Sequence, residues 1–221
     1  MLLQGATFWI PRLGASTQFA TYTVTGVMNA TRRQFVDDDV VCVLNWNLNK
    51  KGTALAKQTF GFANKHQTTT FFDTGDPSPR KRELSELQQL LADTHLDILG
   101  INENELRYYS NCICNSDEDI VNAATSLKQN IHARVDLHTD RFACTINNNT
   151  TIVPTLQVPK IYRTTGAGDA WNAGNIFAGL LNLDNAERLL CASAVAGYYI
   201  SSFEPIHPTL DQLIRFLSKM A

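Results

Sequence analysis

The most informative stretch of this sequence is RTTGAGDAWNAG, which occupies residues 163–174. Gly166, Ala167 and Gly168 are small enough for their backbone N–H groups to approach an anion closely. Apolar residues then recur at helical spacing on one predicted face, namely Ala173, Ile176, Phe177, Leu180 and Leu181. The small residues are therefore predicted to lie at a helix N-terminus, where unpaired N–H groups and the helix dipole favour negative charge.

Asp169 lies in the same predicted turn as the small residues. A carboxylate is no ligand for phosphate, but it can accept the proton of a hydroxyl group that is about to attack a phosphate. The combination therefore predicts phosphoryl transfer to an alcohol. A dinucleotide fingerprint is excluded because Trp171 stands where its third glycine would be, and a Walker A loop because no Gly-Lys-Ser/Thr follows.

This stretch resembles the second signature of the ribokinase-like (PfkB) carbohydrate kinase family, which reads roughly D-T-x-G-A-G-D-x-F-x-x-G. The matching residues are Thr164, Gly166, Ala167, Gly168, Asp169 and Gly174. The resemblance implies that Asp169 is the catalytic base and that Thr164, Gly166, Ala167 and Gly168 form the anion hole that binds the nucleotide. Arg163 stands where the family usually has an Asp that helps to form a monovalent-cation site, so the resemblance gives no support for a monovalent cation here.

A second motif, Asn102-Glu103-Asn104-Glu105, directly follows a strand predicted at residues 96–101. It resembles the N-x-x-E motif of the same family, which helps to organise magnesium and phosphate, partly through water. The resemblance implies that Asn102 and Glu105 serve a hydrated Mg²⁺, an ion that needs only one or two carboxylates near a triphosphate. We expect the Glu105 side chain to sit at a strand-end loop and to be exposed to the cleft. The alternative is that Asn102 caps the next helix and Glu105 is a solvated helix residue.

Two further segments carry weaker matches to the family. Residues 135–143 correspond to a strand and a T-x-G-x-x-G turn that touches the nucleotide in the family, and this chain has His138, Asp140 and Ala143 at the turn. The resemblance makes His138 a nucleotide-binding candidate. Residues 73–80 look like a D-x-x-x-R segment of the family, although a Pro/Gly turn before a helix explains them equally well.

From residue 40 onward the pattern alternates between strands and helices. Strands are predicted at residues 40–44, 69–72, 96–101, 134–138, 142–146 and 150–153. Capping-box patterns begin three of the helices, at Ser116, Asp184 and Thr209, and the last of these is expected to turn Leu210, Leu213, Ile214 and Leu217 inward. This alternation predicts a mostly parallel sheet with helices on both faces. With the resemblance, it indicates an α/β fold of the ribokinase-like three-layer α/β/α type.

The resemblance covers about residues 40–219, the later two thirds of a typical family member. Residues 1–36 read weakly as strands and a short helix, and they contain no G-G-x-x-x-N substrate motif and no clear β-lid. We therefore expect one ribokinase-like domain over residues 1–221, N-terminally truncated relative to the family, with the N-terminal strands and lid absent.

The composition excludes several classes of protein. The 221-residue chain is 44% hydrophobic and 18% charged, and its net charge of −2 offers no basic surface for nucleic acid or for a membrane. Its five cysteines lack a framework spacing and are predicted to be free thiols, as in the cytoplasm. No apolar run approaches the length of a membrane span.

These observations together predict a cytoplasmic kinase that transfers the γ-phosphoryl group of ATP to a hydroxyl of a sugar or nucleoside, with Mg²⁺ as cofactor. The expected partners are the nucleotide and the small-molecule acceptor, and a homodimer is a candidate assembly. Two alternatives remain open. The chain could be a nucleotide-binding remnant without catalysis, or a sugar kinase that uses ADP.

Overall fold

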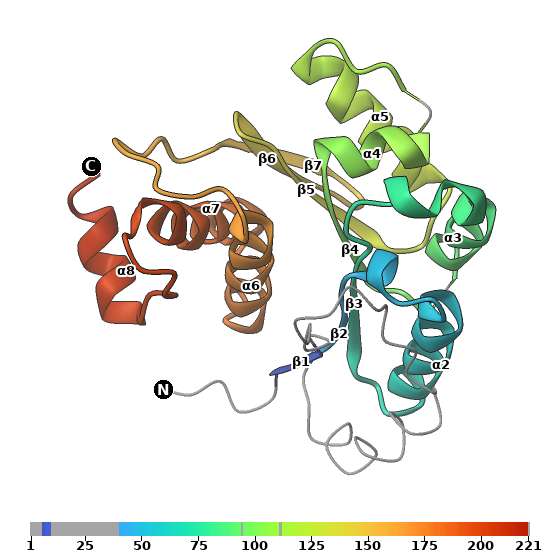
Figure 1. Ribbon diagram of the computed structural model, residues 1–221. Coiled ribbons are helices and arrows are strands. Elements are labelled where there is room, and N and C mark those ends of the chain that lie inside the picture. Colours follow the sequence, from blue (N-terminus) through green and yellow to red (C-terminus); the bar gives the residue numbers. More distant parts are fainter. Residues whose placement is uncertain (1–5, 10–39, 94, 111, 221) are drawn as a thin grey trace. The chain divides into compact units, whose positions relative to one another are not determined.

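The computed structural model describes residues 6–9, 40–93, 95–110 and 112–220 of the 221-residue chain (Figure 1). The chain divides into two compact units, residues 1–136 and 137–221. The expectation of one domain over the whole chain stays a prediction.

The first unit contains a run of parallel strands. These are β1 (Ala6–Trp9), β2 (Val40–Val43), β3 (Thr69–Asp73) and β4 (Ile98–Asn102), and each pairs with the next in parallel. All of β2 and the central residues of β3 and β4 are buried, which explains their continuous apolar sequence. The strands predicted from residue 40 onward in this unit are confirmed, and β1 lies ahead of them. The other expectations for residues 1–36 lie outside the described residues.

Helices join these strands in sequence. They are α2 (Gly52–Lys65), α3 (Leu84–Leu91), α4 (Glu103–Ser110) and α5 (Asp117–Gln129), with short 3₁₀ turns η1 (Trp46–Leu48) and η2 (Ser78–Glu83). Right-handed crossovers between consecutive parallel strands place the connecting helices on one face, and Figure 1 shows α2 and α3 side by side there. Phe60 of α2 meets Phe72 of β3 edge to face, with ring centroids 5.6 Å apart. The core of this unit therefore lies between the strands and this helical layer.

Arg80 holds the loop that follows β2. Its Nη1 donates to the carbonyls of Trp46 and Asn49, at 2.6 and 2.7 Å, and its guanidinium carbon lies 3.8 Å from the centroid of the Trp46 ring. These contacts explain why a charged side chain is buried in η2. The interpretation of residues 73–80 as a structural turn before a helix therefore accounts for Arg80.

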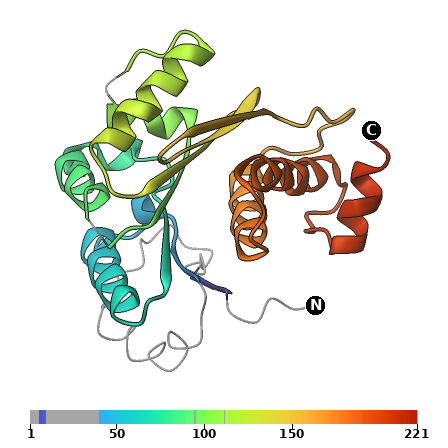
Figure 2. The same cartoon turned by 180° about the vertical axis from the view of Figure 1, so that it is seen from behind.

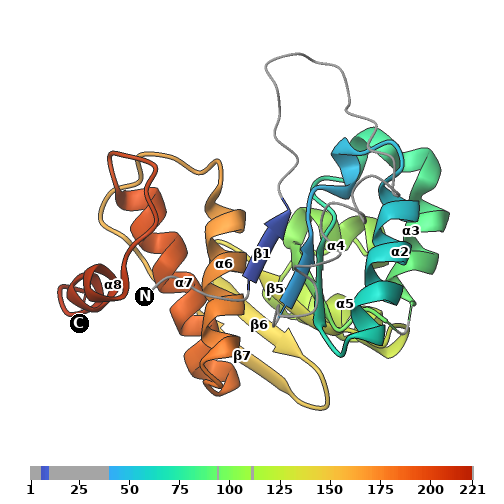
Figure 3. The same ribbon diagram turned by 90° about the horizontal axis from the view of Figure 1, so that it is seen from below.

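The second unit is built from a β-hairpin and three helices. The strand β5 (Arg134–His138) crosses the boundary between the units, β6 (Phe142–Ile146) and β7 (Thr150–Pro154) form an antiparallel pair, and α6 (Ala167–Leu180), α7 (Asn185–Ser201) and α8 (Leu210–Leu217) follow (Figure 2). Figure 3 shows α6 and α7 side by side. Residues from the hairpin and both helices form one buried cluster, comprising Ala143, Val153, Trp171, Leu189 and Ala192.

The three predicted capping boxes are confirmed, but the predicted inward face of α8 is wrong. The helix predicted after the small residues is confirmed as α6; of its regularly spaced apolar residues only Ile176 is buried, and the other buried residues are Ala170, Trp171, Asn172, Gly174, Asn175 and Ala178. In α8 only Leu213 is buried, whereas Leu210, Ile214 and Leu217 are exposed. In α6, Gly174 lets the helix approach the backbone of Ala192 in α7 closely, so small residues occupy much of the buried side. The displaced apolar side chains of α6 and α8 line a surface groove of about 540 Å³.

None of the helices in the described part of the chain combines the length and the apolar composition that a membrane span requires.

Gly174 offers a test of the contact between α6 and α7. A Cβ at this position would lie 2.9 Å from both the Cα of Ala192 and the Cβ of Val195. We expect Gly174→Ala to lower the free energy of unfolding by about 1–3 kcal/mol, because the helices must move apart. Urea unfolding followed by circular dichroism measures this change.

Gly179→Ala, in the same helix, is the matched control. The nearest heavy atom to its added Cβ would be Cδ of Arg188 at 3.8 Å, so helix propensity should dominate and raise stability by up to about 1 kcal/mol. Equal losses of stability in the two variants would show that the contact at Gly174 is not special.

Candidate active site

The predicted anion-binding turn is the N-terminus of α6. Gly166 is the N-cap residue, and its φ of 85° lies in the left-handed region that favours glycine. A Cβ on Gly166 would also lie 2.7 Å from the Tyr199 hydroxyl. Glycine is therefore required here twice, once by the backbone conformation and once by space.

The hydrogen bonds of this turn divide its residues between two tasks. The Ala167 N–H donates to the Thr164 carbonyl at 3.0 Å, and the Ala170 N–H donates to the Gly166 carbonyl at 3.0 Å, so these groups hold the turn and start the helix. The N-cap residue Gly166 has no side chain that could cap α6. The next N–H groups, those of Gly168 and Asp169, belong to a first turn whose donors have no partner within a helix. They are the amides best placed to bind an anion.

Asp169 is exposed in the first turn of α6. Partial desolvation raises the pKa of its carboxyl above the usual value, and the charge of His207 acts in the opposite direction. A carboxylate with a raised pKa is a better proton acceptor than an ordinary surface Asp. The position and the chemistry of Asp169 therefore suit a general base.

His138 ends β5 and lies beside the turn. Its Cε1 would be 3.4 Å from a Cβ on Gly168, which is ordinary van der Waals contact, and its ring centroid is 5.0 Å from that of Trp171. Desolvation lowers the pKa of His138 to about 4, so the imidazole is neutral at neutral pH. It can meet a nucleotide as a neutral ring or a single hydrogen-bond partner, but not as a positive charge.

In the first unit, Asn102 and Glu105 bind each other across the start of α4. The Asn102 side-chain oxygen accepts from the Glu105 N–H at 3.0 Å, so Asn102 caps the helix. In return the Glu105 carboxylate accepts from the Asn102 N–H at 3.1 Å and from its Nδ2 at 2.8 Å. These three bonds fix the carboxylate at the carboxyl end of β4.

The expectation that Glu105 is exposed is wrong, because only 4% of the residue is accessible. The alternative of a solvated helix residue fails for the same reason. Burial is the main cause that raises the pKa of Glu105 well above its usual value, and the negative charges of Asp73 and Asp76 raise it further. The hydrogen bonds from Asn102 act in the opposite direction. A cation close to Glu105 would therefore stabilise the ionised form of this carboxyl.

A surface hollow of about 410 Å³ opens beside this pair. Its lining residues are Asp76, Ser78, Asn102, Asn104, Glu105, Arg107 and Tyr108. Among the described residues there is no cluster of three or more His, Cys, Asp or Glu side chains arranged to hold a metal ion. Mg²⁺ keeps several of its waters and commonly uses one or two carboxylates, so Glu105 and Asp76 fit a hydrated ion rather than a closed protein cage.

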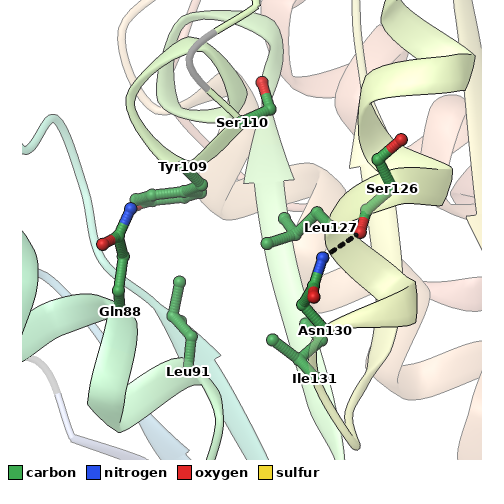
Figure 4. A pocket seen from close by; sticks show the side chains of 8 residues that line it. All are labelled: Gln88, Leu91, Tyr109, Ser110, Ser126, Leu127, Asn130 and Ile131. Atoms are coloured by element: carbon green, nitrogen blue, oxygen red, sulfur yellow. Dashed lines mark hydrogen bonds between the residues drawn. The ribbon is translucent and has the colours of Figure 1, made fainter.

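A second pocket of the first unit, of about 290 Å³, lies among α3, α4 and α5 (Figure 4). Figure 4 shows Gln88 and Leu91 on one side and Leu127 and Asn130 on the other. Tyr109 contributes its ring to this pocket, while its hydroxyl hydrogen-bonds the Thr74 hydroxyl. None of the eight lining side chains is charged, so this pocket has no electrostatic match to a polyphosphate.

The structure thus brings the predicted residues together in two sets. Asn102 and Glu105 form one set in the first unit; Thr164, Gly166, Ala167, Gly168, Asp169 and His138 belong to the other, in the second unit. Sequence reasoning did not assign a role to Tyr199, which contacts the turn, or to His207, whose charge acts on Asp169. Neither belongs to a local motif, and both approach the turn only through the packing of α7 and the segment after it.

Comparisons with known proteins agree with these motifs. The family model described as pfkB family carbohydrate kinase matches residues 39–212. Ketohexokinase from Haloferax volcanii is 44% identical over 55 residues, which is 25% of this chain and 14% of that protein.

Two solved structures share the fold at low sequence identity. Arabidopsis thaliana ribokinase complexed with ribose and ATP has a TM-score of 0.71 at 18% identity, covering 86% of this chain and 59% of that one. Adenosine kinase from Sinorhizobium meliloti has a TM-score of 0.69 at 19% identity, covering 85% of this chain and 56% of that one. The fold is therefore the ribokinase-like α/β fold, and the chain spans less than two thirds of the length of these relatives.

Glu105→Gln tests the magnesium assignment. We expect Mg²⁺-dependent nucleotide binding to weaken about 10- to 100-fold, because the charge that attracts the ion is lost. The free energy of unfolding should change by no more than about 1 kcal/mol, since the lost hydrogen bond from Asn102 is offset by removal of a buried ionisable carboxyl. Calorimetric titration with nucleotide, with and without Mg²⁺, measures the first effect and urea unfolding the second.

Glu103→Gln, in the same helical turn, is the control for charge, because Glu103 instead accepts from Arg107 at 2.7 Å. Unchanged metal dependence in Glu105→Gln would leave Glu105 with a structural role only.

Proposed function

We propose that this chain, which belongs to the pfkB family of carbohydrate kinases, transfers the γ-phosphoryl group of ATP to a hydroxyl group of a sugar or nucleoside. The observation that carries the proposal is the start of α6, where uncapped amides adjoin an exposed carboxylate with a raised pKa. An anion site and a proton acceptor in one turn are what phosphoryl transfer to an alcohol requires.

In the proposed reaction, Asp169 accepts the proton of the acceptor hydroxyl. The hydroxyl oxygen then forms a bond to the γ-phosphorus, and the bond from that phosphorus to the bridging oxygen breaks, so that ADP leaves. The raised pKa of Asp169 supports this role, because it brings the carboxylate closer to the basicity that proton transfer needs.

The turn would stabilise the charge on the transferred group. The Gly168 and Asp169 N–H groups would donate to its oxygens, while Thr164 and Gly166 keep the turn in shape through the hydrogen bonds of their carbonyls. Preorganised donors of this kind need no rearrangement during the reaction, and they commonly supply a large part of catalysis. His138 would contact the nucleotide as a neutral ring.

Mg²⁺ is the proposed cofactor, held in hydrated form with the help of Asn102 and Glu105. When bound, the ion would neutralise negative charge on the triphosphate. The mutual hydrogen bonds of Asn102 and Glu105 support this role. They fix the orientation of the carboxylate, and each of its oxygens keeps a lone pair with which it can accept from a water bound to the ion.

The class of acceptor rests on the relatives. Ketohexokinase, ribokinase with bound ribose and adenosine kinase together support a sugar or nucleoside hydroxyl. We also propose a cytoplasmic location, since the five cysteines carry free thiols.

The proposal is tested by thermal-shift and calorimetric titration of the purified protein with MgATP and MgADP, followed by a phosphoryl-transfer assay with a panel of sugars and nucleosides. Binding of nucleotide with acceptor-dependent release of ADP supports the kinase. Transfer from ADP alone would identify an ADP-dependent kinase, and binding without transfer a nucleotide-binding remnant. A folded protein that binds neither nucleotide at millimolar concentration would refute the proposal.

Asp169→Asn separates the base from the anion site. Asparagine keeps the size of the side chain but cannot take up the acceptor's proton, so turnover should fall by about 10²–10⁴-fold. Nucleotide affinity should hold or rise slightly, because one negative charge beside the phosphates is removed. Steady-state kinetics and calorimetry measure the two effects, and near-normal turnover would reduce Asp169 to a helix-start residue.

The pH profile of phosphoryl transfer should follow the carboxyl of Asp169. Activity requires the carboxylate, so it should fall as the pH drops through the raised pKa of Asp169. His207→Phe removes the charge that lowers this pKa but keeps a ring against Tyr199, so the acid limb of kcat/KM should move to higher pH. His132→Ala, at an exposed site, should leave the limb in place. If His207→Phe does not move the acid limb of kcat/KM, a group other than Asp169 controls that limb.

A further inference from the structure

Arg163 directly precedes the anion-binding turn, and its side chain reaches the C-terminal end of α7. Nη1 donates to the carbonyls of Tyr199 and Ser202, at 3.3 and 2.8 Å, and Nη2 donates to the carbonyl of Phe203. All three acceptors belong to the main chain where α7 ends. One guanidinium therefore donates hydrogen bonds to three carbonyl oxygens at the C-terminal end of α7.

Such a terminus attracts positive charge. The last carbonyls of a helix have no partner within it, and the helix dipole makes this end negative. The residue after α7, Ser202, is extended rather than left-handed, so the glycine-type cap that often closes a helix is not formed. The neighbouring Tyr162 N–H completes the arrangement by donating to the Ile200 carbonyl at 2.8 Å. Residues 162 and 163 thus act together as the cap of α7.

The same end of α7 carries the side chain that contacts the anion-binding turn. The Tyr199 hydroxyl lies 2.7 Å from where a Cβ on Gly166 would be, so the tyrosine fills the space that the glycine leaves. The Tyr199 ring stacks on His207, with centroids 5.1 Å apart and planes inclined by 16°. His207 in turn influences the proton affinity of Asp169. A shift of the C-terminal end of α7 would therefore move Tyr199 and His207, and so change both the position of the turn amides and the proton affinity of Asp169.

We propose that Arg163 is a positioning residue for phosphoryl transfer: its guanidinium is a tethered cation that binds the end of α7 and so keeps Tyr199 and the 164–168 turn in the nucleotide-binding arrangement. Because this cation is part of the chain, the carbonyl cluster needs no small cation from solution, and potassium has no effect on nucleotide binding. The inference rests on the proposed function, since it concerns nucleotide binding at this turn.

The test compares MgATP affinity in potassium chloride and in tetramethylammonium chloride at equal ionic strength. The wild type should bind equally in both salts. Arg163→Ala should bind at least about tenfold more weakly, because each charge-assisted hydrogen bond that orders the turn is worth about that factor. Millimolar, non-denaturing guanidinium or potassium should restore part of the affinity in this variant alone. Arg163→Lys, which keeps the charge but not the planar fork, should be intermediate.

Arg215→Ala is the matched control, because Arg215 is an exposed arginine of α8 in the same unit. It should change neither affinity nor salt response. If Arg163→Ala does not fold, Arg163→Lys decides the question by the same two measurements.

Three results would overturn the inference. The first is wild-type affinity that rises with potassium, and the second is unchanged affinity in the Arg163 variants. The third is a loss of thermal stability in Arg163→Ala with normal affinity per folded molecule and no rescue by guanidinium, which would make Arg163 only a helix cap. Absence of nucleotide binding by the wild type in both salts would instead refute the proposed function itself.

Discussion

The close contact between α6 and α7 is the constraint on which the anion-binding turn of the second unit depends. Gly174 allows the contact, because any side chain there would meet the backbone of Ala192. The contact buries Trp171 one turn earlier, and Trp171 in turn supports the ring of His138. A helix placed in this way presents its first turn, with Gly168 and Asp169, at a defined position.

The two ends of α7 have different tasks in this arrangement. Its N-terminus is closed locally by a capping box between Asp184 and Glu187, which involves no distant residue. Its C-terminus is closed by Tyr162 and Arg163, the residues that lead into the anion-binding turn. The turn and the helix therefore hold each other, since Arg163 caps α7 while Tyr199 of α7 packs over Gly166. This reciprocal contact makes the geometry of the amides a property of the whole second unit.

Desolvation shifts the pKa of three functional candidates in different ways. Desolvation raises the pKa of Glu105, and the nearby carboxylates of Asp73 and Asp76 raise it further. A bound cation would offset both effects, which suits the proposed role of Glu105 beside Mg²⁺. Desolvation also raises the pKa of Asp169, but there the opposing charge is His207, which suits a proton acceptor that must remain ionised. The same physical cause lowers the pKa of His138, since its charged form is the cation. One physical effect, desolvation, thus shifts the pKa upward for the two carboxyls and downward for the imidazole.

The sequence by itself determined the elements and the local motifs. The continuous apolar runs predicted the buried strands from residue 40 onward, and the capping boxes predicted three helix starts, because both signals arise from neighbouring residues. The glycine turn and Asp169 were found for the same reason. Tertiary structure alone decided which faces are buried: α6 turns Gly174 toward α7, where a Cβ would meet Ala192, and leaves Phe177 and Leu180 only partly buried. It also decided the burial of Glu105, the neutral state of His138 and the contacts of Arg163 with the end of α7, because each depends on groups that are distant in the chain and meet only after packing.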